Sequence, residues 1–267
     1  MEKKNRFNIV SKTKQSRFIL PSLLTLVGVC LGISSIKFAL DGNYTQGVIF
    51  LVCAAFLDTL DGRIARLIKG TSEFGRELDS LTDFVSFGIA PAFILYFWEL
   101  KNYGKLGWAI TLIYSVCCVL RLARFNLTRI PDSEEWKLNY FEGVPSPAGA
   151  GLALLPLIYE LSDFNLSPEI KSVTPFFVIV VAFLLISKVP TFSLKKIKIS
   201  SRLSIFLLFG IIITFVSLIF FTFNTLLLLG LVYLLSIPLS YFFSKRNNKK
   251  FISKEKKENE EDHEDIL

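Results

Sequence analysis

Long apolar segments, separated by short groups of charged residues, constrain this chain more than any other feature of its sequence. Of its 267 residues, 52% are hydrophobic and only 20% are charged, and the charges lie between the apolar segments. An apolar helix of about 20 residues crosses the roughly 30 Å hydrocarbon core of a bilayer. Because a helix satisfies its own backbone hydrogen bonds there, the sequence predicts an all-α, polytopic transmembrane helical bundle.

The apolar segments predict about eight membrane spans. Lys and Arg gather before the first span and after the second, fourth, sixth and eighth, whereas the intervening loops carry few. Because positively charged loops remain in the cytoplasm, we expect both chain ends on the cytoplasmic side of the cell membrane. The spans run approximately over residues 18–40, 46–65, 78–98, 106–125, 147–161, 173–189, 203–221 and 226–243.

The same pattern divides the chain into four predicted parts. Residues 1–17 form a basic leader, either an interfacial helix or a solvated anchor, and residues 18–190 form the transmembrane core. Residues 191–244 hold the last two spans, which carry no charge within the membrane and are expected to pack or to support a dimer. Residues 245–267 mix Lys with Glu and Asp and have almost no apolar content, which predicts a disordered tail.

Composition argues against several classes of site. The single histidine, His263, lies in the charged tail, and the four cysteines lie in apolar blocks without a CxxC spacing. Histidine or cysteine metal ligands are therefore not expected within the membrane. The net charge of +7 comes from residues that flank apolar segments. Such charges orient a membrane protein, and no nucleic-acid partner is expected.

Four aspartates lie at or within the ends of the second and third predicted spans. Two are three residues apart and two are four residues apart, so each pair shares one face of its helix. Carboxylates in a membrane are costly, and four together need cations. Because hard divalent ions take oxygen ligands, the sequence predicts two Mg²⁺ or Mn²⁺ ions, suited to phosphoryl chemistry. The expected ligands are Asp58, Asp61, Asp79 and Asp83.

Two other interpretations of these aspartates remain open at this point. They could pair with Arg63, Arg66 and Arg76 near the membrane surface, or they could form the ion path of a cation transporter. A transporter would spread its carboxylates through the depth of the membrane or across repeats, whereas these four lie together near one end of their spans. A metal site at this depth is expected to open toward the cytoplasm.

Eight residues around these aspartates resemble a family signature. Their types and spacing are similar to the full signature of the CDP-alcohol phosphatidyltransferases, a family that transfers a phosphatidyl group from a CDP-activated lipid to an alcohol. The eight residues are Asp58, Asp61, Gly62, Ala65, Arg66, Gly75, Asp79 and Asp83.

The resemblance implies a role for each matching residue. The first three aspartates would bind the metal ions, and Asp83 would also touch metal and act as general base on the acceptor hydroxyl. The implied reaction is a direct displacement in which CMP leaves, and a homodimer is expected from the resemblance alone. The CDP-lipid would be held by Gly62, Ala65, Arg66, Ser72 and Gly75.

Three further stretches resemble the phosphatidylserine synthase branch of that family, which implies L-serine as the acceptor. They are LDSLTDFVSFGIAPA at 78–92, RLARFN at 121–126 and FEGVPSPAGAG at 141–151. Glycerol 3-phosphate or inositol phosphate is the alternative acceptor. Either carries a phosphate group, which would need an additional cluster of positively charged groups to bind it.

Within these stretches, two groups of residues have alternative interpretations. Guanidinium groups are bidentate partners of carboxylates and phosphates, so Arg121 and Arg124, with Asn126, are candidates for binding the serine carboxylate or the lipid phosphate. Alternatively, the two arginines only anchor the fourth span. Pro145 and Pro147 predict either a break before the fifth span or an ordinary helix start.

Overall fold

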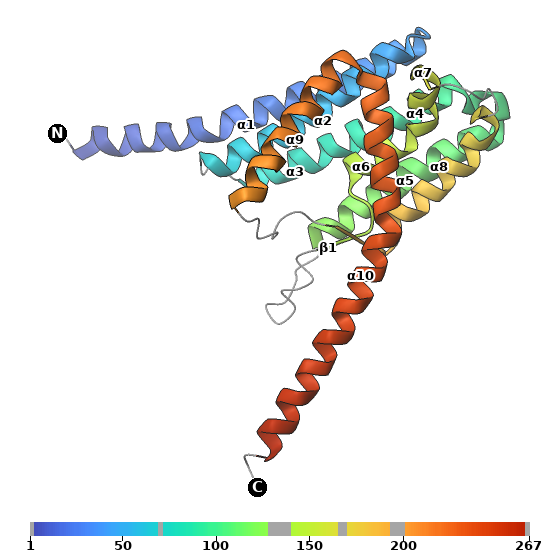
Figure 1. Cartoon of the computed structure of the whole chain (residues 1–267). Helices are drawn as coiled ribbons and strands as arrows, with labels where there is room; N and C mark the ends of the chain where they lie inside the picture. Colours follow the sequence, from blue (N-terminus) through green and yellow to red (C-terminus); the bar gives the residue numbers. More distant parts are fainter. Residues whose placement is uncertain (1–2, 69–71, 128–139, 165–169, 193–200, 265–267) are drawn as a thin grey trace. The chain divides into compact units, whose positions relative to one another are not determined.

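The computed structural model describes residues 3–68, 72–127, 140–164, 170–192 and 201–264, and most of them are helical (Figure 1). The chain divides into two compact units. Unit 1 comprises Met1–Thr128 and Pro145–Ile186, and unit 2 comprises Arg129–Val144 and Ser187–Leu267. The predicted core at 18–190 therefore includes a segment, 129–144, that groups with the C-terminal part of the chain.

The helices of unit 1 occupy the first six predicted spans, and α1 packs along α2 while α5 packs along α8 (Figure 1). Two short helices of other types, the π-helical η1 (Phe84–Ile89) and the 3₁₀-helical η2 (Leu100–Tyr103), lie before and after α4. The α-helices are α1 (Lys3–Leu40), α2 (Tyr44–Leu67), α3 (Glu73–Asp83), α4 (Ala90–Trp98), α5 (Lys105–Leu127), α6 (Ser146–Ala153), α7 (Leu155–Leu161) and α8 (Ile170–Ile186).

A tight turn joins α1 to α2 and makes a helical hairpin. Gly42 takes a φ of 77°, which glycine adopts without strain, and the Asn43 side chain caps α2 by accepting a hydrogen bond from the Gln46 N–H. A Cβ at Gly47 would lie 3.2 Å from the Ser35 carbonyl oxygen, so the two backbones approach closely here. The hairpin brings the C-terminal half of α2 beside the middle of α1.

The third predicted span is one long helix with a local change of geometry. It runs from Glu73 to Trp98 through α3, η1 and α4. Ser72 caps its start, because the Ser72 Oγ accepts a hydrogen bond from the Gly75 N–H at 2.9 Å. The helix widens into π geometry at Phe84 and returns to α geometry at Ala90.

The fifth predicted span consists of two short helices. Helix α6 has eight residues and carries Pro147 in its first turn, which matches the ordinary helix start among the two interpretations. Helix α7 has seven residues and carries Pro156 in its first turn. Because proline has no N–H to continue a helical ladder, the break falls after Ala153.

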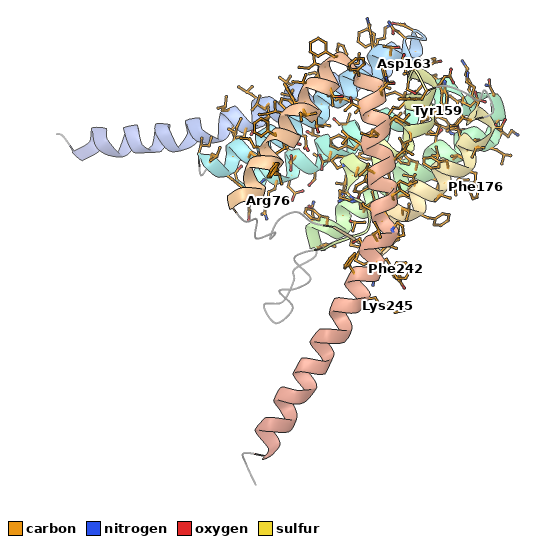
Figure 2. The ribbon with its side chains drawn as sticks, in the orientation of Figure 1. Arg76, Tyr159, Asp163, Phe176, Phe242 and Lys245 are labelled. Carbon is orange, nitrogen blue, oxygen red and sulfur yellow. The ribbon has the colours of Figure 1, made fainter. Side chains whose placement is uncertain are left out.

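Among the described residues, four helices are long and apolar enough to cross a membrane: Leu20–Leu40, Glu73–Trp98, Lys105–Leu127 and Thr222–Lys245. The apolar helices Ile170–Ile186 and Phe206–Phe220 are shorter. Many large apolar side chains are exposed, as lipid contact requires; Phe176 of α8 is 70% exposed and points outward (Figure 2). These helices are those of a membrane protein, while the count of about eight spans and the cytoplasmic termini remain predictions.

Unit 2 contains a small antiparallel sheet that the all-α prediction did not include. Strand β1 (Tyr140–Glu142) pairs with β2 (Pro190–Phe192), with Phe141 opposite Thr191. The Gly143 N–H donates to the Val189 carbonyl oxygen at 2.9 Å, which extends the pairing by one bond. The helices of this unit are α9 (Ser201–Phe220) and α10 (Thr222–Glu264).

The basic leader and the charged C-terminal tail both contain helix in the structure. Helix α10 continues past Phe242 and Lys245 (Figure 2) and is described to Glu264, where the sequence predicts disorder. Lys and Glu are strong helix formers, and Lys–Glu pairs at helical spacing add support, which accounts for the continuation. At the other end, α1 begins at Lys3, so the leader is helical and runs directly into the first span.

Candidate functional site

Three of the four predicted metal ligands converge between α2 and α3. Carboxylate oxygens of Asp58, Asp61 and Asp79 all lie within 4.8 Å of one another. Asp61 is buried, and Asp58 and Asp79 are partly buried. The i, i+3 spacing on α2 sets two of these groups on one face, and the packing of the helices adds the third.

Asp83, the fourth aspartate, lies one helical turn beyond Asp79. Because it follows Asp79 by four residues, it lies on the same face of the helix. Within the described part of the chain, Asp83 Oδ1 is buried and has no hydrogen-bond partner. Buried carboxylate oxygens are normally paired, so this oxygen is free to accept a proton or to contact a cation.

The donor set fits a hard divalent cation. The three clustered groups are carboxylates, which repel one another without a positive charge between them, and oxygen ligands are those that Mg²⁺ and Mn²⁺ prefer. The unpaired Asp83 oxygen and the 4.8 Å cluster supply several such ligands in one place. The cluster therefore fits a metal centre.

Among the described residues, Arg66 and Arg76 contact groups other than the four aspartates. The Arg66 Nε donates to the Gly62 carbonyl oxygen at 2.9 Å, and the Arg76 Nη2 lies 3.8 Å from the Glu73 carboxylate. Both arginines are exposed. Their charges are therefore available to a ligand at the end of α2 and the start of α3.

Thr25 of α1 is a site residue that the sequence analysis missed. Its Oγ1 donates to the Asp61 Oδ2 at 2.6 Å, and the threonine is only 6% exposed. A buried hydroxyl group that bonds a carboxylate from another helix fixes the direction of that carboxylate. The available signal was a polar residue within the apolar first span, but its position alone does not say which helix it faces.

The predicted CDP-lipid residues lie in the chain between the aspartate pair of α2 and the aspartate pair of α3. Gly62, Ala65 and Arg66 belong to the last turns of α2, and Ser72 and Gly75 form the capped start of α3. A Cβ at Gly62 would meet only the Arg66 side chain, at 4.0 Å, so the α2 backbone is accessible there. The two groups frame the segment between α2 and α3, and their contact with the lipid remains a prediction.

The three predicted acceptor residues occupy different environments. Arg121 of α5 donates to the Ser146 Oγ of α6, and its positive charge acts on Asp83. The Arg124 Nη1 donates to the Ile186 carbonyl oxygen at 2.5 Å, at the C-terminus of α8. The Asn126 Nδ2 donates to the Ser80 Oγ at 3.0 Å, which ties α5 to α3. Of the three, Arg121 is the one that lies one turn from Cys118, which packs against Gly88 in the turn after Asp83.

Two further polar side chains line the same face of α5 as Arg121. Cys118 is fully buried, and a Cβ at Gly88 of η1 would lie 3.2 Å from its Sγ. Tyr114 is also fully buried, and its hydroxyl group donates to the Phe87 carbonyl oxygen at 3.0 Å. Sequence reasoning treated the cysteines only as members of apolar blocks, because the partner residues are far away in the chain.

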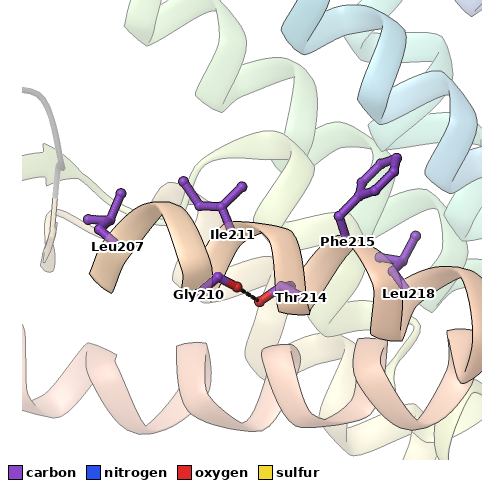
Figure 3. Close-up of a pocket in the computed structure, with 6 residues that line it drawn as sticks. All are labelled: Leu207, Gly210, Ile211, Thr214, Phe215 and Leu218. Carbon is purple, nitrogen blue, oxygen red and sulfur yellow. Dashed lines mark hydrogen bonds between the residues drawn. The ribbon is translucent and has the colours of Figure 1, made fainter. Parts of the chain in front are cut away.

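A hollow on α9 of unit 2 has a different chemical character. Figure 3 shows the Thr214 Oγ1 donating to the Gly210 carbonyl oxygen of its own helix, at 2.8 Å. None of the lining residues is charged, so this hollow suits an apolar side chain or an acyl chain and not a pyrophosphate. The lining residues are Leu207, Gly210, Ile211, Thr214, Phe215 and Leu218.

Comparison with known proteins identifies the family. The family model for CDP-alcohol phosphatidyltransferases matches residues 18–237. The chain belongs to this family. The match covers the converging carboxylates of α2 and α3, so three signature residues of this CDP-alcohol phosphatidyltransferase family member, Asp58, Asp61 and Asp79, also meet in space.

Curated relatives of this family member carry one shared name, CDP-diacylglycerol–serine O-phosphatidyltransferase. The relative from Mycobacterium tuberculosis is 43% identical over 133 residues, which cover 49% of this chain and 46% of the relative. The relative from Helicobacter pylori is 33% identical over 199 residues, which cover 74% of this chain and 82% of the relative. The relative from Bacillus subtilis is 37% identical over 141 residues, which cover 52% of this chain and 76% of the relative. The chain thus spans about half the length of the mycobacterial relatives it matches.

Proposed function

We propose that this chain transfers a phosphatidyl group from CDP-diacylglycerol to the hydroxyl group of L-serine, giving phosphatidylserine and CMP. The observation that carries the proposal is the convergence of Asp58, Asp61 and Asp79, with Asp83 one helical turn beyond Asp79. The names of the relatives support serine as the acceptor. A different family member would be expected to keep the carboxylates and to change the residues around Arg121.

The carboxylate cluster would hold two divalent cations, Mg²⁺ or Mn²⁺. Asp58, Asp61 and Asp79 are the proposed ligands, and Asp83 contributes its free oxygen. When bound, such ions neutralise the charge of the pyrophosphate and of the departing CMP. Thr25 keeps the Asp61 carboxylate turned toward this centre through the 2.6 Å hydrogen bond.

Asp83 is the proposed general base. An alcohol is a weak nucleophile at neutral pH, so its proton must leave as the oxygen attacks. The serine oxygen bonds to the phosphorus that carries the diacylglycerol, the bond from that phosphorus to CMP breaks, and the hydroxyl proton moves to Asp83. No phosphatidyl–enzyme intermediate is involved. Trapping of a covalent lipid adduct in the absence of serine would contradict this route.

The CDP-lipid would bind across the end of α2 and the start of α3. The Arg66 guanidinium is exposed and can make a bidentate contact with a phosphate oxygen pair. Gly62 leaves the α2 backbone accessible to the nucleotide, and Ser72 holds the first turn of α3 through Gly75. Ala65 keeps the same face small enough for the pyrophosphate to approach.

The serine carboxylate would bind at Arg121. Arg121 lies on the face of α5 that packs on the turn after Asp83, so an amino acid bound there by its carboxylate would direct its hydroxyl group toward the base. Arg124 and Asn126 already donate hydrogen bonds to Ile186 and Ser80. We therefore propose that they contribute less than Arg121 to binding the serine carboxylate or the lipid phosphate.

The proposed location is the cytoplasmic membrane, with both termini and the site facing the cytoplasm. The supporting observation is the alternation of Lys and Arg among the loops. We also propose a homodimer, on the family resemblance, with membrane lipid and the two substrates as the remaining partners and no nucleic acid.

The experiment that tests the proposed function is the transfer of labelled L-serine into chloroform-soluble lipid by detergent-solubilised protein. The assay contains CDP-diacylglycerol with Mg²⁺ or Mn²⁺, and the Asp83→Asn variant runs alongside. Metal-dependent product that disappears in the variant is the expected result. Product with glycerol 3-phosphate or inositol phosphate, but none with serine, would overturn the choice of acceptor and retain the mechanism.

A further inference from the structure

The helix that carries Asp79 and Asp83 changes geometry immediately after Asp83. Helix η1 is π-helical, and at its end the Ala90 N–H donates to the Val85 carbonyl oxygen, five residues back. An α-helix would make this bond over four residues. A π turn inserts one extra residue into the helix, is rare, and is frequently found at functional sites.

Pro91 explains why this turn needs support from outside its own helix. In α geometry, the Phe87 carbonyl oxygen would accept a hydrogen bond from the N–H of residue 91, and proline has none. The hydroxyl group of Tyr114, from α5, donates to the Phe87 oxygen at 3.0 Å. Tyr114 is 0% exposed, so water cannot replace this bond. The wide turn and α5 are therefore joined by one buried hydrogen bond.

The same face of α5 leads from this bond to the proposed acceptor site. Tyr114, Cys118 and Arg121 are spaced i, i+4 and i+7, which places them along one side of the helix. This side packs closely on η1, because a Cβ at Gly88 would lie 3.2 Å from the Cys118 Sγ. The Tyr114 bond therefore sets the position of η1 relative to the face that carries Arg121.

We infer that Tyr114 is a positioning residue for phosphatidyl transfer. By holding the wide turn after Asp83 against α5, it keeps Asp83 in register with Arg121. The proposed base and the proposed serine-binding group then stand at a fixed separation. The inference rests on the proposed function, and it adds to that function a residue outside the family signature.

The chain offers a matched control for Tyr114. The hydroxyl group of Tyr44, on α2, donates to the Phe97 carbonyl oxygen, also at 3.0 Å. The acceptor is again a phenylalanine carbonyl on the 73–98 span, but at the end of α4 away from the aspartates. Tyr44→Phe and Tyr114→Phe thus remove the same kind of bond from the same span, one near its C-terminal end and one near its middle.

The test compares steady-state kinetics of these two variants with the wild type, with the melting temperature in detergent as the measure of folding. We expect Tyr114→Phe to lower kcat for serine transfer about tenfold, the equivalent of one lost hydrogen bond, with the KM for CDP-diacylglycerol unchanged. Tyr44→Phe should lower the melting temperature without lowering kcat. Equal kcat values for the two variants, in an active wild-type background, would overturn the inference and leave the proposed function intact. Absence of transfer by the wild type would instead overturn the proposed function.

A second variant separates positioning from stability, and also provides folded protein if Tyr114→Phe unfolds. Pro91→Ala restores an N–H at residue 91, so the double variant Tyr114→Phe/Pro91→Ala again offers the Phe87 oxygen a donor, from its own helix. The inference expects the melting temperature to recover while kcat stays low, because α5 is still not bonded to the turn. Recovery of kcat together with the melting temperature would show a merely structural role and overturn the inference.

Discussion

Two threonines, one in each unit, have their hydroxyl oxygen within hydrogen-bonding distance of a carbonyl oxygen one turn earlier, that of Pro21 for Thr25 and that of Gly210 for Thr214, but they belong to different kinds of region. Thr25 of unit 1 is buried and bonds the Asp61 carboxylate from another helix. Thr214 of unit 2 is on the largely exposed, apolar helix α9, and its hydroxyl group bonds the Gly210 carbonyl oxygen one turn earlier. A hydroxyl group that satisfies its own helix needs no functional explanation, whereas one that directs a carboxylate in a membrane span does. The difference indicates that chemistry is concentrated in unit 1.

The largest expected effect comes from removing a clustered carboxylate. Asp79→Asn should lower serine transfer at least about 100-fold, because a direct ligand should cost more than the 10–100-fold typical of groups behind the ligands. The measurement is transfer rate against Mg²⁺ or Mn²⁺ concentration. Asp41→Asn is the control, since Asp41 pairs with Lys37 at the exposed end of the α1–α2 hairpin. An Asp79→Asn protein with near wild-type activity would place the metal centre elsewhere.

The next effect concerns the acceptor end of unit 1. Arg121→Ala should raise the KM for L-serine about 20-fold, because hydrogen bonds to charged groups contribute about 1.5–3 kcal/mol. With serinol, which has the hydroxyl groups but no carboxylate, the same variant should change the KM little. Arg76→Ala is the matched control, because this exposed arginine lies near Glu73. A KM that rises equally for both acceptors would reject carboxylate binding by Arg121.

A third prediction applies one substitution to both members of the threonine comparison. Thr25→Val should raise the Mg²⁺ or Mn²⁺ concentration needed for half-maximal activity about tenfold, since it frees the Asp61 carboxylate to turn away. Thr214→Val should change that concentration by less than about twofold, as surface substitutions usually do. The two metal titrations decide the point. Equal shifts would remove the distinction between bonds within a helix and bonds between helices.

The smallest expected effect is a gain in stability within unit 2. A Cβ at Gly210 would have no atom within 4 Å, so Gly210→Ala should stabilise α9 by up to about 1 kcal/mol. Gly107→Ala in unit 1 is the control of opposite sign, because its Cβ would lie 1.8 Å from the Leu100 carbonyl oxygen. Thermal unfolding in detergent measures both. A stable Gly107→Ala protein would mean that unit 1 is packed more loosely than described.

The helices could be predicted from the sequence because their signals are local. The apolar segments predicted where helices lie, and α5 begins and ends within two residues of the prediction at 106–125. Local signals misled where two of them competed: the charged tail reads as disordered by its lack of apolar residues, yet its Lys and Glu favour the helix described to Glu264. The strands β1 and β2 were missed because each has three residues and its partner is about 50 residues away.

The sequence by itself determined that this is a helical membrane protein and that each of two helices carries a pair of aspartates on one face. Those facts follow from the 3.6-residue period of a helix, which any stretch of sequence displays. Only the tertiary structure decided that the two faces meet, that Thr25 reaches Asp61, and that Tyr114 reaches the turn after Asp83. Such contacts depend on how side chains from distant segments pack together, and no local period encodes that packing.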